Sequence, residues 1–234
     1  AVLLTLAILL TLGTWQVERL YWKEALLADI AERRTSEPVA LTQIEGRMAA
    51  GEDIEYSRVS LNGTFDHAKE RHFFATFQGQ TGFFVYTPLM LGDGRALFVN
   101  RGFVPYDLKD AAKRPQGQVA GQQQLTGYAR APLTQKPSLI VPDNVPAKNM
   151  FYWKDMSAMA SSAEVDGAGL VPIFVDADAS VTNPGGWPKG GVTLFDMPNN
   201  HLQYAVTWFG LAFVLVAMVF GLWWRSRHPG LAEQ

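Results

Sequence analysis

The chain has 234 residues, of which 48% are hydrophobic and 18% charged, and its formal net charge is −2. This composition excludes a disordered polymer and leaves room for one substantial core. The near-neutral charge is not the electrostatic signature of a nucleic-acid-binding protein, so no nucleic-acid partner is expected. The chain contains no cysteine, which excludes disulfides, thiolate nucleophiles, iron–sulfur clusters and covalent haem attachment through C-x-x-C-H.

Apolar residues gather at both ends of the chain. Residues 1–14 and residues 202–224 carry no charged side chain. The second run has 23 residues, which at about 1.5 Å rise per residue can cross a hydrocarbon core of roughly 30 Å. The first run is short for a span and begins without a Met or a basic stretch, so we expect it to continue upstream. A cleaved signal peptide is the alternative for the first run, and a buried globular helix is the alternative for both.

These runs predict four parts of the chain. Residues 1–34 are expected to form a transmembrane helix that extends into a juxtamembrane helix, because no helix breaker separates the apolar run from the amphipathic stretch after it. Residues 35–197 form a β-rich exterior domain, residues 198–224 a second transmembrane helix, and residues 225–234 a short tail. Membrane lipid is therefore an expected partner.

The flanks of the second run predict its orientation. Aromatic residues stand near both of its ends and basic residues follow it: Tyr204, Trp208, Trp223, Trp224, Arg225 and Arg227. Aromatic belts with basic residues on the cytoplasmic side are the usual pattern of a membrane interface. We therefore expect a multi-pass protein of the bacterial plasma (inner) membrane with its main domain in the periplasm, or of the mitochondrial inner membrane if the source is eukaryotic.

The hydrophobic period changes to two after residue 38. Strands are predicted at 58–65, 71–77, 83–91, 96–104, 122–130, 149–154 and 170–176, with short helices at 106–113 and 155–163. The sequence Gly92-Asp93-Gly94 predicts a hairpin between two of the strands. Met156, Met159, Ala160 and Ala163 share one face of the second short helix. The predicted fold class is a membrane protein whose two helices flank a mostly antiparallel barrel or sandwich.

The sequence contains no recognisable catalytic set. It lacks G-x-S-x-G, S-x-x-K and H-E-x-x-H motifs, so an enzyme is not expected and a membrane-tethered hydrolase is the least favoured hypothesis. His67 and His72 are predicted to be exposed loop histidines, because five residues of spacing would place them on opposite faces of one strand. The alternative, a metal site that they share, is possible only if a turn separates them. His228 lies in the basic tail, where it is expected to be solvated.

His201 is the remaining histidine and stands at the start of the second apolar run. Asn199 or Asn200 is expected to cap the helix that follows. Tyr204 and Trp208 then share the helical face of His201, so the imidazole lies above an aromatic strip at the outer interface. Such an imidazole either ligates a flat hydrophobic cofactor, docks a partner helix, or simply anchors the span.

Arg19 lies just above the first apolar run, near Trp15 and Trp22. If the two helices pair, Arg19 is placed to face His201 and to neutralise a carboxylate such as a haem propionate. The alternative is an interfacial cation whose side chain reaches out to the membrane surface.

Five segments in order resemble the Surfeit locus protein one family of cytochrome c oxidase assembly proteins. They are LGTWQVERLYWKEALL (12–27), RVSLNGTF (58–65), GFFVYTPL (82–89), LFVNRGFVP (97–105) and PNNHLQYAVTWFGLA (198–212). The resemblance implies two spans around an exterior domain, transient binding of haem A, and its delivery to oxidase subunit I. It also implies haem A synthase as a partner.

The resemblance implies a role for single residues as well. His201 corresponds to the histidine to which haem binding is assigned in bacterial members of the family, so His201 is the candidate axial ligand of the haem iron. Tyr204, Trp208 and Arg19 are the expected neighbours of the haem. Arg101 and Gly102 match a family motif that we interpret as structural, because glycine permits a bend or a close approach of backbone in a strand. A cofactor-free scaffold that stabilises subunit I is the alternative function.

Overall fold

A computed structural model describes residues 1–165, 169–195 and 197–228. The chain divides into two compact units, which are described separately. The helical unit comprises residues 1–31 and 195–234, and the strand-rich unit comprises residues 32–194. Residues 229–234 of the predicted tail lie outside the described residues.

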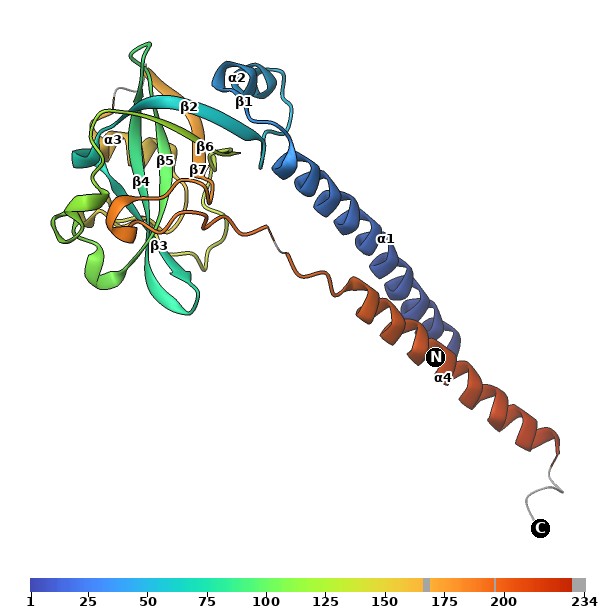
Figure 1. The fold of residues 1–234 in the computed structure, drawn as a ribbon. Helices are drawn as coiled ribbons and strands as arrows, with labels where there is room; N and C mark the ends of the chain where they lie inside the picture. The colour runs from blue at the N-terminus through green and yellow to red at the C-terminus, as the bar shows by residue number, and fades with distance from the viewer. Residues whose placement is uncertain (166–168, 196, 229–234) are drawn as a thin grey trace. The chain divides into compact units, whose positions relative to one another are not determined.

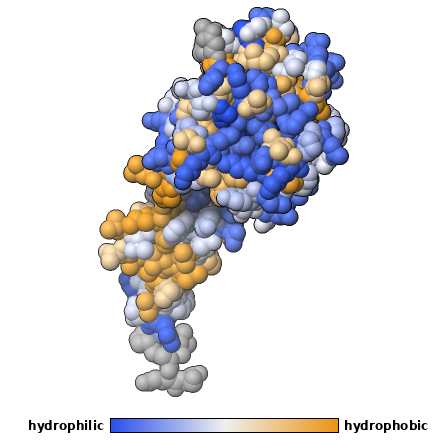
Figure 2. Space-filling model, turned by 90° about the vertical axis from the view of Figure 1, so that its left-hand side faces the viewer, coloured by the Kyte–Doolittle hydropathy of each residue, from blue (hydrophilic) through white to orange (hydrophobic). Residues whose placement is uncertain are grey.

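The helical unit contains two long helices, α1 (Val2–Thr35, 34 residues) and α4 (His201–Arg227, 27 residues). Both are long and apolar enough to cross a membrane. Their large apolar side chains are mostly exposed, as for Leu3 (82%) and Phe213 (74%), and Figure 2 shows hydrophobic residues gathered over this unit. A water-facing helix would hide such side chains, so this exposure favours a lipid environment.

The helices α1 and α4 lie side by side (Figure 1), and small residues lie where they contact each other. Gly13 is buried in α1, and Ala205 and Ala212 are the buried residues of α4. A Cβ atom at Gly13 would lie 2.7 Å from the ring of Phe209. Glycine at this position therefore lets the aromatic ring lie directly against the backbone of α1, as is common where membrane helices pack.

The strand-rich unit is built on a closed five-stranded barrel. Its strands, in spatial order, are β2 (Arg58–Phe65), β6 (Gln122–Arg130), β7 (Leu170–Ala177), β5 (Ala96–Pro105) and β4 (Gln80–Leu91). Pairing of β2 with β4 closes the ring. The short β1 (Val39–Ala40) pairs with β2, and β3 (Arg71–Phe77) pairs with β4.

Neighbouring barrel strands are antiparallel except for β5 and β7, which run parallel. Alternation fixes which side chains fill the interior. In β2 the buried positions include Val59, Leu61 and Phe65, which are separated by multiples of two residues, as the period of two predicts. The predicted β-rich barrel between two apolar helices is thus confirmed.

A second core lies between the barrel and α3 (Met156–Ala163). Its apolar residues come from the helix, from strands β4, β5 and β7, and from one loop: Met156, Met159, Ala160, Ala163, Tyr86, Phe98, Phe174 and Phe151. The side chain of Asp155 accepts a hydrogen bond from the backbone of Ala158 and begins the helix. The shared apolar face predicted for this helix is therefore confirmed.

Three segments differ from the sequence prediction. Residues 149–154 do not form a strand, because Asn149 adopts a left-handed conformation (φ 48°) and the segment makes only isolated bridges. Tyr106–Leu108 and Ala111–Lys113 form two separate 3₁₀ turns instead of one short helix. The helix α2 (Leu41–Ala49) was not predicted; it buries only Leu41 and Ile44, and so its apolar pattern is too short to detect.

Candidate functional site

His201 is the first residue of α4. Asn200 makes no side-chain cap, and the side-chain oxygen of Asn199 lies 3.5 Å from the His201 backbone nitrogen. The predicted cap is therefore supplied weakly and by Asn199 alone. Because His201 begins α4, its imidazole lies at one end of an apolar helix, and the residue is half-buried.

The partner of His201 is Gln16 of α1, which sequence reasoning missed. Its side-chain oxygen lies 2.7 Å from His201 Nδ1, and Gln16 is only 8% exposed. A carbonyl oxygen can only accept a hydrogen bond, so Nδ1 carries the hydrogen in this geometry. One feature of the sequence could have identified Gln16. It is a polar amide just after the apolar run, where a polar side chain near the membrane needs a partner.

The predicted aromatic neighbours lie along α4. Ala205 is buried against α1, Tyr204 is 53% exposed and Trp208 is half-buried. Tyr204, Ala205 and Trp208 are three, four and seven residues after His201, so they lie on the same face of α4. On this face the small residue, Ala205, is the buried one. On that side Tyr204 is exposed and Trp208 is only partly exposed.

Arg19 does not contact His201. Its guanidinium lies 4.2 Å from the centre of the Trp22 ring, in a cation–π contact on its own helix. Arg19 is three residues beyond Gln16 and so is its neighbour on the surface of α1. The structure thus brings Gln16 and His201 together and leaves Arg19 about one turn away.

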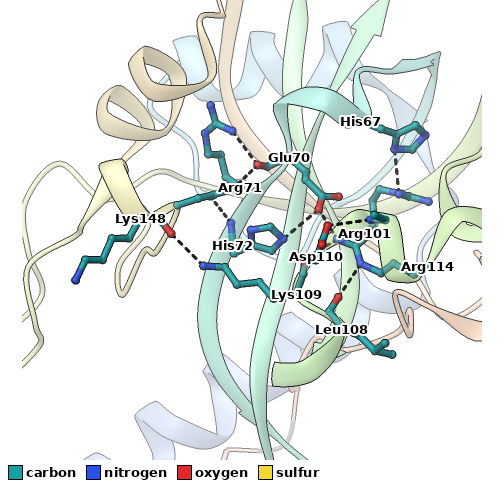
Figure 3. A network of polar contacts seen from close by, with 12 residues as sticks. His67, Glu70, Arg71, His72, Arg101, Leu108, Lys109, Asp110, Arg114 and Lys148 are labelled. Atoms are coloured by element: carbon teal, nitrogen blue, oxygen red, sulfur yellow. Dashed lines mark hydrogen bonds and ion pairs between the residues drawn. The ribbon is translucent and has the colours of Figure 1, made fainter.

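The strand-rich unit holds a second set of polar residues that the sequence did not predict (Figure 3). His72 is 5% exposed, and its Nε2 lies 3.1 Å from Glu70 Oε1. Arg114, 4% exposed, also pairs with Glu70. The prediction that His67 and His72 are exposed loop histidines is therefore wrong. His72 points inward from β3, and His67 is half-buried in a 3₁₀ turn.

His67 has both ring nitrogens bonded. Nε2 donates to the Val119 carbonyl at 2.8 Å, and Nδ1 accepts from Arg101 at 3.2 Å. Burial lowers the pKa of His67 below 6.5, and the positive charge of Arg101 acts in the same direction against the hydrogen bond to Val119. This imidazole therefore serves as a neutral structural link.

Charges of both signs lie in this buried set, which holds the carboxylate of Glu70 and the guanidinium groups of Arg101 and Arg114. Burial alone would raise the pKa of Glu70, but the hydrogen bond from His72 and the charge of Arg114 lower that pKa below 4.5. Burial lowers the pKa of Arg101 to about 10, so its guanidinium stays charged at neutral pH. Removing one partner from a buried ion pair is strongly destabilising, so this set supports the fold.

Arg101 and Gly102 hold the loop before α4 in place. Arg101 donates to Asn183 Oδ1 at 2.6 Å, and Asn183 in turn donates to the Pro188 carbonyl at 2.6 Å. Gly102 has φ 128°, and a Cβ atom there would lie 2.1 Å from the Lys189 carbonyl oxygen. The close backbone approach expected at Gly102 is therefore present.

A cavity of about 610 Å³ lies beside these residues, lined by His67, Glu70, His72, Tyr106, Lys109 and Lys113 among others. The ring nitrogens of its two histidines bond to no hydroxyl group among the described residues. Within the described part of the chain, no group of three or more His, Asp or Glu residues is arranged to hold a metal ion.

The fold defines a class of protein in which two candidate membrane helices, one near each end of the chain, flank one barrel domain in the sequence. The sequence matches the SURF1 family over residues 3–213. It is 37% identical to Surfeit locus protein 1 of Rattus norvegicus over 239 residues, which covers 94% of this chain and 73% of the rat protein. The corresponding human protein is 36% identical over 94% of this chain and 74% of its own length.

A more distant relative, the SURF1-like protein of Drosophila melanogaster, is 30% identical over 92% of this chain and 72% of its own length. The chain belongs to the SURF1 family. Membership implies a role in cytochrome c oxidase assembly. The matched region includes both Gln16 and His201.

Proposed function

We propose that this protein binds haem A through His201 and assists the insertion of haem A into subunit I of cytochrome c oxidase. Haem A is a cargo in this proposal and not a resident cofactor. The observation that carries it is the state of His201: Nδ1 is hydrogen-bonded to Gln16, and Nε2 has no hydrogen-bond partner among the described residues. A neutral imidazole with one free nitrogen is a common axial ligand of haem iron.

The surroundings of His201 suit the chemistry of haem. The ring is flat and apolar, whereas the propionates are anionic, so haem favours a site where an apolar surface meets water. The side of α4 beyond His201 offers the exposed Tyr204 and the half-buried Trp208 to such a ring. A half-exposed single ligand on a helix surface also leaves the site open, as transfer to an acceptor requires.

Arg19 is the proposed partner of a propionate. Its present contact is with the ring of Trp22, and exposed cation–π contacts contribute only about 0.5–1 kcal/mol. A charge-assisted bond to a carboxylate is stronger, so Arg19 can exchange the one contact for the other at little cost.

The ends of α4 support a proposed location. Arg225 and Arg227 occupy the last turn of α4, and basic residues prefer the cytoplasmic side. We place the protein in the bacterial plasma membrane, with the barrel and His201 on the periplasmic side and lipid around both helices. The proposed protein partners are oxidase subunit I as acceptor and haem A synthase as donor.

The test is co-purification with and without co-expressed haem A synthase, followed by a visible spectrum. We expect a haem absorption band that His201→Ala abolishes. His228→Ala is the matched control, because His228 lies at the opposite end of α4, stacked on Trp224, and its loss should leave the band unchanged. Equal haem content in the His201→Ala variant would reject the ligand assignment. A wild-type protein without the band would favour the cofactor-free scaffold.

A further inference from the structure

Gln16 is a polar residue buried at the contact between α1 and α4, where helix packing restricts its side chain. It is one of three buried residues of α1, together with Gly13 and Ile30. Gly13 lies one turn before it and is covered by the Phe209 ring, which leaves no room for a Cβ atom. The contact between α1 and α4 therefore fixes both the distance and the direction from which the Gln16 amide approaches His201.

The hydrogen bond between Gln16 and His201 determines which ring nitrogen is free. In a neutral imidazole one nitrogen carries the hydrogen and the other carries a lone pair. The Gln16 oxygen, 2.7 Å from Nδ1, selects the form with hydrogen on Nδ1. The lone pair is then on Nε2, the nitrogen that points away from Gln16. Free imidazole side chains favour the opposite form, so the contact with α1 changes the equilibrium.

We propose that Gln16 is a positioning residue for His201, which holds the imidazole in the orientation and hydrogen-bonded form that present Nε2 to haem iron. This inference rests on the proposed function of His201. Histidines that bind metals commonly donate their other N–H to a carbonyl or carboxylate oxygen, and loss of that acceptor typically weakens metal binding by about 10–100-fold. An amide acceptor supports the ligand without adding a charge at the edge of the membrane.

The purely structural alternative is that Gln16 only helps the two helices to pack. The two roles differ in their readout. A packing role predicts that a Gln16 variant changes helix association and protein yield, while the state of the imidazole stays the same. A positioning role predicts a changed imidazole in a protein that still folds.

The first experiment reads the imidazole of the full chain in lipid nanodiscs without haem, by NMR of ¹⁵N-labelled histidine. We expect the His201 signal of the Nδ1–H form in the wild type and of the ordinary Nε2–H form in Gln16→Leu. Gln203→Leu is the matched control, because Gln203 is exposed on α4 only two residues from His201, and it should match the wild type. An Nε2–H form in the wild type, or an unchanged form in Gln16→Leu, would overturn the proposal.

The second experiment measures haem retention and the reduction potential of the haem-loaded protein. We expect Gln16→Leu to retain haem about tenfold less tightly. Gln16→Glu should restore retention, because a carboxylate still accepts the hydrogen bond, and it should lower the potential, because a more basic imidazole favours the oxidised iron. Equal retention and potential in Gln16→Leu and the wild type would also overturn the proposal.

The two experiments separate failure of this inference from failure of the proposed function. If His201→Ala keeps its haem, the ligand assignment of His201 is wrong, and the positioning role toward haem falls with it. The NMR result would then still decide whether Gln16 controls the imidazole. If His201→Ala loses haem but no Gln16 variant changes the imidazole, retention or potential, only the inference is wrong.

Discussion

The barrel and the helix pair both hold histidines against polar partners, but they leave those histidines in different states. In the barrel, His67 has both nitrogens bonded, and the second nitrogen of His72 is buried away from solvent. In the helix pair, His201 is half-buried and uses one nitrogen only. The comparison teaches that the type of residue does not identify a ligand site. A ligand site also needs a free, accessible ring nitrogen beside a surface that suits the ligand, as at His201.

The surroundings explain this difference. The barrel histidines sit among Glu70, Arg101 and Arg114, where every charge has a nearby group that favours it. The helix pair offers His201 one neutral amide and an otherwise apolar surface. We therefore expect substitutions in the barrel to change stability and substitutions in the helix pair to change haem binding.

The largest expected effect on stability comes from Arg114→Met. This variant leaves the buried carboxylate of Glu70 without its charged partner, which typically costs about 3–5 kcal/mol. Urea unfolding in detergent, followed by tryptophan fluorescence, would measure the loss. Haem content per folded molecule should stay at the wild-type value, and a selective loss of haem would break the comparison. Lys136→Met is the control, since its partner Asp143 is 90% exposed and the expected cost is under about 1 kcal/mol.

A smaller effect is expected from the titration of His67. Its pKa is lowered by burial in the folded protein, so the unfolded chain binds the proton first as the pH falls below about 6.5. The contribution of this neutral imidazole to stability is complete above that pH and is lost as the pH falls toward the folded pKa. His67→Gln keeps a donor and an acceptor but cannot titrate. The free energy of unfolding, measured from pH 7.5 to 5, should change less with pH in the variant than in the wild type. An equal pH dependence in both proteins would contradict the assignment.

The smallest effect is expected from Arg19→Gln. A partly exposed ion pair contributes up to about 1 kcal/mol, so retention of haem should fall measurably, by up to about fivefold. The barrel should unfold as in the wild type. Arg225→Gln, at the far end of α4, is the control and should not change retention. Haem retention that is equal in Arg19→Gln and the wild type would remove Arg19 from the site and sharpen the role of His201.

Local pattern was enough to predict most of the fold. Alternation of apolar residues placed β2, β3 and β6 at their observed bounds, and a charge-free run predicted α4. The left-handed turn at Asn149 could not be predicted, because its side chain accepts a hydrogen bond from the backbone of His72 in β3, which is far away in the sequence. Closure of the barrel by β2 and β4 also depends on long-range pairing.

The site was predictable only in part. His201 stood out because a helix start, an apolar run and aromatic residues surround it in the sequence. Gln16 is separated from it by 185 positions, and no local pattern pairs them. His72 was predicted to be exposed for the same reason. It pairs with Glu70, and Glu70 pairs with Arg114, which is 44 positions away in the sequence. Long-range contacts decide whether a polar residue is bonded or free.

Ligation of haem iron by His201 is the central claim, and chemical rescue tests it most directly. His201→Gly removes the ring while leaving room for free imidazole, so the purified variant, mixed with haem A, should show a spectrum without the histidine-ligated band. Added imidazole should restore the wild-type band at saturating concentration, and His228→Gly should need no imidazole. A His201→Gly variant with the wild-type spectrum before imidazole is added would contradict the account.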